Sequence, residues 1–303
     1  MHLLMTGVTM GAADVVPGVS GGTMAFIMGI YEELVNAIKA FNWQVLTRIL
    51  RLRVGEALAD VPWRFLVVLG TGVLGAFVTL ARPIGWLLDH RPVLLYAFFF
   101  GLILASIVAV SRQIRWSPTA YLFLILGTGI AYFVVGLVPL EMPHDMWALF
   151  LSGMAAITAM ILPGISGSFI LLILGQYEFV IDSMKEGAVL NLVPLALGCV
   201  VGILGFVRIL SWLLKSHHRP TIALLVGFMV GSLRKIWPFK VTLEQIIGRH
   251  GEPVPIVQAN VLPDLDATFG IAFGLCVLGF VLVYVLDRVA GADRVEMAAG
   301  RLG

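Results

Sequence analysis

Residues 146–177 form an apolar stretch without a charged side chain, and Pro163 and Gly164 interrupt it near its middle. As one straight helix at about 1.5 Å per residue it would be about 48 Å long, whereas the hydrocarbon core of a bilayer is about 30 Å thick. Proline removes a backbone donor, and glycine permits a sharp change of direction. We therefore expect a re-entrant hairpin of two half-helices that meet at this proline-glycine step.

The same pattern occurs near the N-terminus, where Pro17 and Gly18 interrupt the apolar stretch 3–30. Small and polar residues around this step recur 146 positions later, as the pairs Gly18 and Gly164, Ser20 and Ser166, Gly21 and Gly167, Gly29 and Gly175, Tyr31 and Tyr177, and Glu32 and Glu178. Farther along, Arg82 recurs 126 positions later as Arg208. A longer polar linker in the first copy explains the change of offset, so the sequence predicts two copies of one unit.

The composition excludes a soluble globular domain, because 59% of the residues are hydrophobic and only 13% are charged. Further candidate spans lie at 65–88, 93–110, 119–140, 192–214, 221–233 and 267–286, of which 221–233 is shorter than the about 20 residues that a membrane span needs. We therefore expect an all-α polytopic membrane protein with two inverted repeats. Each repeat would contain a re-entrant broken-helix hairpin and three transmembrane helices.

Repeat 1 is expected to cover 1–140, with its hairpin at 3–37 and an amphipathic linker at 39–64. Repeat 2 would cover 146–288, with its hairpin at 146–182, and residues 289–303 would form a short cytoplasmic tail. Three spans per repeat give an odd number of crossings, which inverts the second copy. With the linker inside, most of the 20 Lys and Arg residues are cytoplasmic, as the positive-inside rule requires. Both termini are then cytoplasmic.

The linker contains Arg48, Arg51 and Arg53 among leucines, together with Trp43. This pattern is typical of an interfacial helix attracted to anionic lipid, although such a run is more often only a topology signal.

Glycine and hydroxyl residues follow each proline-glycine step, namely Ser20, Gly21, Gly22 and Thr23 in the first copy and Ser166, Gly167 and Ser168 in the second. A half-helix that begins inside the membrane presents unpaired N–H groups and a partial positive charge, and glycines let an anion approach the backbone. Two such tips facing each other would bind an oxyanion. The alternative is that the small residues only permit close helix packing.

Arg82 and Arg208 fall within predicted spans, where an arginine must pair, face a polar cavity or snorkel to the headgroups. As a duplicated pair they are candidate phosphate ligands, because a guanidinium binds two oxygens at once.

Asp14 lies three residues before Pro17 and has Met160 as its counterpart. A carboxylate at this depth is a candidate coupling site for H+ or Na+, or else a structural cap. The duplicated Glu32 and Glu178 are further candidates, unless they lie solvated at the membrane edge.

Nothing in the sequence points to a cofactor, a metal or a catalytic residue. Cys199 and Cys276 lie in apolar runs without ligand-type neighbours, and the histidines lack metal spacing. The formal net charge of +2 gives no basis for a nucleic-acid partner.

The segment GAADVVPGVSGGT at 11–23, followed by GIYEELVNAI at 29–38, resembles the signature of the bacterial polyprenyl-phosphate transporters, a family long described as a domain of unknown function. The resemblance covers essentially the whole chain. It implies a flippase that returns undecaprenyl phosphate, the lipid carrier of cell-wall precursors, from the outer to the inner leaflet of the cytoplasmic membrane. The residues it implicates are Asp14, Pro17, Gly18, Ser20, Gly21, Gly22, Thr23, Pro163, Gly164, Ser166, Gly167 and Ser168.

Two other functions share some of these features. The undecaprenyl-pyrophosphate phosphatases resemble an inverted repeat with a motif close to PGxSRS, but Gly21-Gly22 and Gly167-Ser168 stand where that motif has its arginine. A carrier of a small soluble anion would share the hairpins and Asp14. We expect the partners to be undecaprenyl phosphate, membrane lipids and H+ or Na+. The small residues Gly70, Gly72 and Gly75 would pack within one subunit or in a homodimer.

Overall fold

The computed structural model describes residues 2–16, 18–112, 114–137, 142–247 and 253–299. Pro17 therefore lies outside the described residues, as do the last residues of the predicted span 119–140. The first half contains α1 His2–Val15, α2 Gly21–Ile27, α3 Tyr31–Lys39, α4 Trp43–Leu50, α5 Val54–Asp60, α6 Trp63–His90, α7 Pro92–Ser111 and α8 Pro118–Val134. The second contains α9 Met146–Ile161, α10 Gly167–Ile173, α11 Tyr177–Lys185, the 3-10 turn η1 Val189–Leu192, α12 Val193–Ser216, α13 His218–Ile236, β1 Lys240–Ile247, β2 Pro253–Asn260 and α14 Ala267–Ala299.

The prediction of an all-α polytopic membrane protein is confirmed. Among the described residues, four helical segments are long and apolar enough to cross a bilayer, namely Trp63–His90, Pro92–Ser111, Val189–Ser216 and Ala267–Leu286. Apolar side chains on these helices and on α8 point outward, and Val78 is 82% and Phe133 69% exposed. Such surfaces are unfavourable in water, whereas in a bilayer they contact acyl chains.

Each predicted hairpin contains three helices, where the sequence predicted two. The first break follows α1 and α9, and Gly18 and Gly164 have φ angles of 89° and 90° there. A second break follows α2 and α10 at Gly29 and Gly175, with φ angles of 71° and 68°. Glycine adopts these left-handed conformations without the steric cost that other residues incur. Helices α10 and α11 consequently meet at 107°, and their re-entrant placement remains a prediction.

The first helix of each hairpin packs closely against a long helix, α1 on α6 and α9 on α12. A Cβ atom at Gly7 would collide with the carbonyl oxygen of Leu69, and one at Gly153 with that of Leu195. These contacts are related by the offsets of 146 and 126 residues that the sequence shows. Glycine thus allows backbones to approach within the distance that membrane helices use to gain packing energy.

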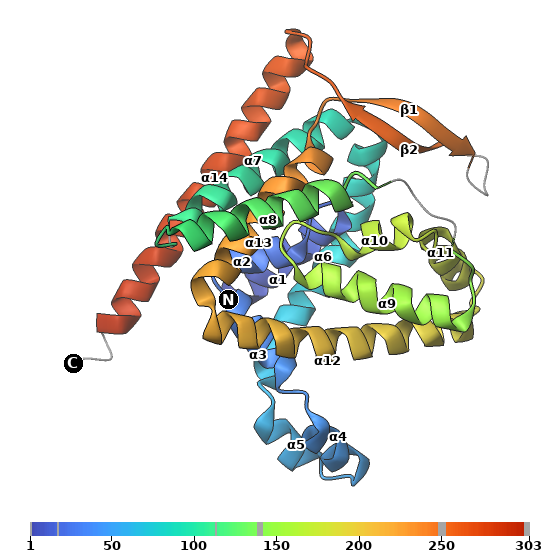
Figure 1. Ribbon diagram of the computed structural model, residues 1–303, viewed down its shortest axis with the longest axis vertical. Coiled ribbons are helices and arrows are strands. Elements are labelled where there is room, and N and C mark those ends of the chain that lie inside the picture. The colour runs from blue at the N-terminus through green and yellow to red at the C-terminus, as the bar shows by residue number, and fades with distance from the viewer. Residues whose placement is uncertain (1, 17, 113, 138–141, 248–252, 300–303) are drawn as a thin grey trace.

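The remaining long helices pair across the two halves of the chain. Helix α7 packs along α14, and α8 packs along α13, as Figure 1 shows. Gly101 of α7 lies against Cys276 of α14, and Gly227 of α13 lies against Leu124 of α8. The predicted division at 140–146 therefore separates two segments whose helices pack against each other, α7 against α14 and α8 against α13. We retain that division as a prediction about repeats.

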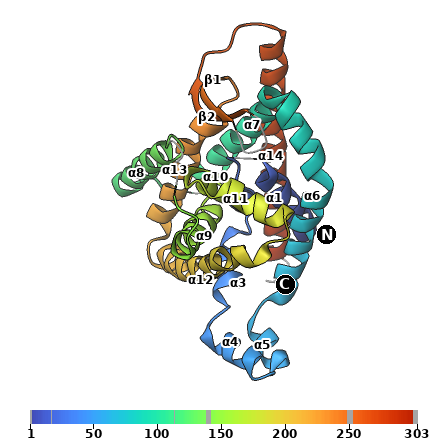
Figure 2. The same cartoon turned by 90° about the vertical axis from the view of Figure 1, so that its right-hand side faces the viewer.

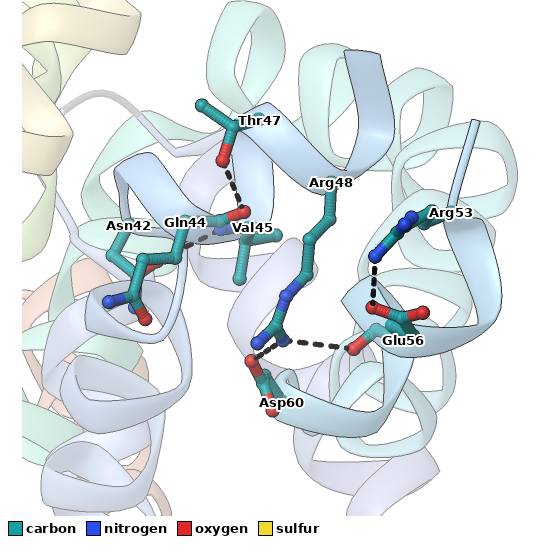
Figure 3. A network of polar contacts seen from close by, with 8 residues as sticks. All are labelled: Asn42, Gln44, Val45, Thr47, Arg48, Arg53, Glu56 and Asp60. Atoms are coloured by element: carbon teal, nitrogen blue, oxygen red, sulfur yellow. Dashed lines mark hydrogen bonds and ion pairs between the residues drawn. The ribbon is translucent and has the colours of Figure 1, made fainter. Parts of the chain in front are cut away.

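Two small substructures lie at opposite ends of the molecule in both views (Figure 1 and Figure 2). One is the linker, where α4 and α5 pack together and Arg48 binds Asp60 and the Glu56 carbonyl, as Figure 3 shows. The other is the antiparallel pair β1–β2, which lies between α13 and α14 in the sequence. Trp43 on α4 is 73% exposed, and the interfacial role of this linker remains a prediction.

Gly72 and Gly70 lie two residues apart on α6 and form a matched pair for testing the α1–α6 contact. A Cβ atom at Gly72 would collide with the carbonyl oxygen of Leu4, whereas one at Gly70 meets nothing within 4 Å. We expect Gly72→Leu to lower the free energy of unfolding by about 1–3 kcal/mol more than Gly70→Leu, because only the first overpacks an interface. Thermal unfolding in detergent measures both variants, and equal melting temperatures would contradict this packing.

Candidate functional site

The two proline-glycine tips meet inside the molecule and are joined by hydrogen bonds. Ser20 Oγ lies 3.2 Å from the carbonyl oxygen of Met160 and 3.3 Å from that of Leu162, and it donates to this pair. In the other direction, the backbone N–H of Gly164 donates to Thr23 Oγ1 over 3.0 Å. Ser20 and Thr23 are fully buried. Residues predicted for the two copies of the motif are thus brought into one cluster.

Close packing around this cluster requires glycine. A Cβ atom at Gly22 would lie 2.7 Å from the carbonyl oxygen of Ile161, which also accepts a 3.1 Å hydrogen bond from the Tyr31 hydroxyl. Tyr31 is buried, whereas its counterpart Tyr177 is exposed. The two tips therefore make unequal contacts although their sequences match.

Ser20 and Ser166 also differ as helix caps. Ser20 Oγ accepts the N–H of Gly22 at 3.1 Å and so caps α2. Ser166 makes no side-chain cap on α10, and its hydroxyl lies 2.8 Å from that of Ser168. Among the described residues, these two hydroxyl groups of the second motif make no hydrogen bond to the first hairpin.

Asp14, near the C-terminal end of α1, contacts the N-terminal end of α2. Its Oδ1 atom accepts the N–H of Gly21 over 2.6 Å, and a Cβ atom at Gly21 would collide with the carboxylate. A carboxylate at a helix N-terminus stabilises the exposed N–H groups. Asp14 therefore has a structural contact, and its assignment as a coupling site remains a prediction.

Helix α13 passes over both tips. A Cβ atom at Gly164 would lie 2.8 Å from Ser232 Oγ, and one at Gly18 would lie 3.1 Å from Cγ of Lys235. The ammonium of Lys235 stands 4.5 Å from the ring centroid of Phe169 on α10. Lys235 thus contacts both hairpins, although the sequence analysis did not select it. Lys235 is not a duplicated residue, because the equivalent position in the first copy is Ala109.

The two duplicated arginines lie apart from this cluster. Arg82 is exposed on α6, and Arg208 is exposed on α12, where its guanidinium donates to the carbonyl oxygens of Leu204 and Phe41. Among the described residues, no hydrogen bond or ion pair joins either arginine to the tips. Their role as phosphate ligands remains a prediction.

Glu32 and Glu178 begin α3 and α11, where carboxylates favour the positive end of a helix. Glu32 pairs with His218 at 3.4 Å and lines a cavity of about 260 Å³ that also includes Tyr31 and Arg219. Glu178 is half-buried. A coupling role for either residue remains a prediction. In the described part of the chain, no group of three or more His, Cys, Asp or Glu side chains could hold a metal ion.

The sequence was also compared with protein families, curated proteins and solved structures. Residues 10–254 match the family model described as undecaprenyl phosphate translocase-like. A polyprenyl-phosphate transporter of Vibrio cholerae is 43% identical over 86% of this chain and 84% of its own. A polyprenyl-phosphate transporter of Staphylococcus aureus is 33% identical over 96% of this chain and 97% of its own. No solved structure gives a significant match.

Proposed function

Because this chain belongs to the undecaprenyl phosphate translocase-like family, we propose that it carries undecaprenyl phosphate across the bacterial cytoplasmic membrane. The direction that we propose is from the outer to the inner leaflet, which would return the carrier lipid for another cycle. The relatives named as transporters support transport without chemical conversion. With the linker 39–64 in the cytoplasm, both termini would also be cytoplasmic.

The observation that carries this proposal is the hydrogen-bonded junction between the two hairpin tips. A phosphate headgroup needs polar partners to cross a hydrocarbon core, because an unpaired charge is costly there. Ser20 and Thr23 hold the tips together, and their hydroxyl groups become available when the tips separate. The same side chains would therefore close the pathway when it is empty and bind phosphate oxygens when it is open.

The interleaved helices suit alternating access. Each tip lies between helices from both halves of the chain, so a relative motion of the two halves would open one side while the other remains packed. The isoprenoid tail would stay among lipid acyl chains, and only the headgroup would pass the tips. This division of the substrate requires a lateral opening between helices.

Purified protein in liposomes tests the proposal directly. A fluorescent short-chain polyprenyl phosphate is placed in both leaflets, and its accessibility to a membrane-impermeant quencher is followed with time. We expect rapid exchange of the phosphate lipid and none of the matching polyprenol. Equal rates for the two lipids, or release of inorganic phosphate from a polyprenyl pyrophosphate, would reject the proposed function in favour of nonspecific scrambling or hydrolysis.

Two substitutions of Asp14, tested in the same liposomes, distinguish a role in ion coupling from a role as a helix cap. The variant Asp14→Asn keeps the Oδ1 acceptor for the Gly21 N–H but removes the charge, whereas Asp14→Ala removes both. If Asp14 carries the coupling ion, both variants should lose transport driven by an H+ or Na+ gradient, by about tenfold or more. If it is only a cap, Asp14→Asn should retain gradient-driven transport while Asp14→Ala loses stability by about 1 kcal/mol.

A further inference from the structure

A cavity of about 750 Å³ lies beside the hairpin tips, between the C-terminal end of α13, the helices α7 and α8, and the β-hairpin. Three of its lining residues are cations, Arg234 and Lys235 from α13 and Lys240 from β1. None of the lining residues carries a carboxylate. Among the described residues, none of these three cations makes an ion pair. Among the described residues, the cavity therefore gathers three positive charges and no carboxylate.

Each of these three cations lies over an aromatic ring. The guanidinium of Arg234 lies 4.3 Å from the ring centroid of Tyr132, and the ammonium of Lys240 lies 4.4 Å from that of Tyr96. Together with Phe169 beside Lys235, each cation thus has one ring as neighbour. A ring face attracts a cation by about 0.5–2 kcal/mol, which is weaker than a charge-assisted bond to an oxyanion in a desolvated site. The rings orient the cations and leave them able to bind an anion.

Capping of α13 explains part of this arrangement. Lys240 donates to the carbonyl oxygen of Lys235, and the Asn260 side chain donates to that of Arg234 over 2.9 Å. Cations are favourable at a helix C-terminus, so Lys240 has a structural reason for its position. Capping does not account for Lys235, because its side chain extends along Gly18 toward Phe169. Lys235 connects the cavity to the hairpin tips.

We propose that Arg234, Lys235 and Lys240 form a binding site for a phosphate monoester, which receives the headgroup before it reaches the hairpin tips. The inference rests on the proposed function for the identity of the lipid. A monoester carries up to two negative charges and three acceptor oxygens, which suits three cations lining one cavity better than a singly charged phosphodiester does. The planar fork of Arg234 also suits two oxygens of one phosphate.

The position of the site agrees with uptake from the outer leaflet. The β-hairpin that contributes Lys240 lies at the end of the molecule opposite the linker helices α4 and α5 (Figure 1 and Figure 2). With the linker in the cytoplasm, as charge distribution predicts, the cavity faces the outside. Phe100 and Leu243 in its lining give the first isoprene units an apolar surface next to the cations.

Binding to the full-length protein in lipid nanodiscs tests this site. The ligands are undecaprenyl phosphate, undecaprenol, inorganic phosphate and phosphatidylglycerol, and the variants are Lys235→Met, Lys240→Met and Arg234→Gln. We expect each variant to weaken undecaprenyl phosphate binding by about tenfold, or about 1.4 kcal/mol. Lys185→Met, which removes an exposed lysine from the end of α11, is the matched control and should bind as the wild type does.

The outcomes of this experiment distinguish failure of the proposed binding site from failure of the proposed function. If wild-type protein prefers undecaprenyl phosphate to undecaprenol and all three variants bind it equally well, the site is wrong and the proposed function stands. If wild-type protein does not prefer it, the proposed function fails. Inorganic phosphate binding that depends on the same cations would then assign the site to free phosphate. Should Lys240→Met fail to fold without its cap, Lys235→Met and Arg234→Gln decide the matter.

The pH dependence gives a second readout. Burial, together with the charge of Lys235, lowers the pKa of Lys240 to about 7. The groups that face Lys240 are Lys235 and Arg234 from α13 and Tyr96 from α7, while its β2 partner Asn260 does not titrate. Lys240 is charged below this pKa, so phosphate binding should weaken as the pH rises from 7 to 9. Lys240→Arg keeps its charge and should remove that decline; an unchanged pH profile would contradict the role of Lys240.

Discussion

Replacement of Gly164 by alanine is expected to reduce transport by more than about a hundredfold. The φ angle of Gly164 is 90°, and a Cβ atom there would lie 2.8 Å from Ser232 Oγ and 2.9 Å from the carbonyl oxygen of Phe228. A left-handed alanine costs about 1–2 kcal/mol, and overpacking against α13 adds about 1–3 kcal/mol. A total near 3 kcal/mol corresponds to that loss if the closed junction is part of the transport cycle.

Gly187 provides the control for this prediction. Its φ angle is 71°, but nothing lies within 4 Å of the position that a Cβ atom would occupy. Gly187→Ala should therefore lose about 1 kcal/mol of stability from backbone strain and retain transport. The lipid accessibility assay and thermal unfolding measure the two effects separately. Normal transport by Gly164→Ala would show that the contact between this tip and α13 is dispensable.

Replacement of Thr23 by valine is expected to reduce transport by about thirtyfold. The two side chains have nearly the same shape, but valine cannot accept the N–H of Gly164, which Thr23 accepts over 3.0 Å in a fully buried position. An unpaired buried donor costs about 2 kcal/mol, which corresponds to about thirtyfold. The loss arises at the junction between the two hairpins and should appear in the same transport assay.

Thr23→Ser restores the hydroxyl and should recover most of the transport lost in Thr23→Val. This rescue separates the hydrogen bond from simple packing, because serine is smaller than both threonine and valine. Loss in both variants would assign Thr23 to packing alone. Full activity in Thr23→Val would mean that the junction does not depend on this bond.

The membrane class and the main helices were predictable because long apolar runs have few alternative structures. The predicted span 93–110 corresponds to α7, and the proline-glycine steps fall where α1 and α9 end. The second break at Gly29 and Gly175 was also available in the sequence. In each case a glycine stands close before a tyrosine-glutamate pair that begins a new helix, which is a stop signal followed by a start signal.

Other features depend on tertiary structure and leave little trace in the sequence. Lys235 follows a span that is flanked by several charges, so it resembles an ordinary boundary residue until α13 is seen against Gly18. Arg82 and Arg208 show the opposite case. Their duplication suggests a symmetric ligand pair, and both are exposed on their helices, so that pairing remains a prediction.

The exchange of partners between the two halves has a consequence for biosynthesis. Helices α7 and α8 are made early, but their packing partners α14 and α13 belong to the later half of the chain. Both must therefore wait in the bilayer, or with the insertion machinery, until the ribosome has completed that half. Neither half contains a complete set of partners, so the stable unit of assembly is the entire polypeptide.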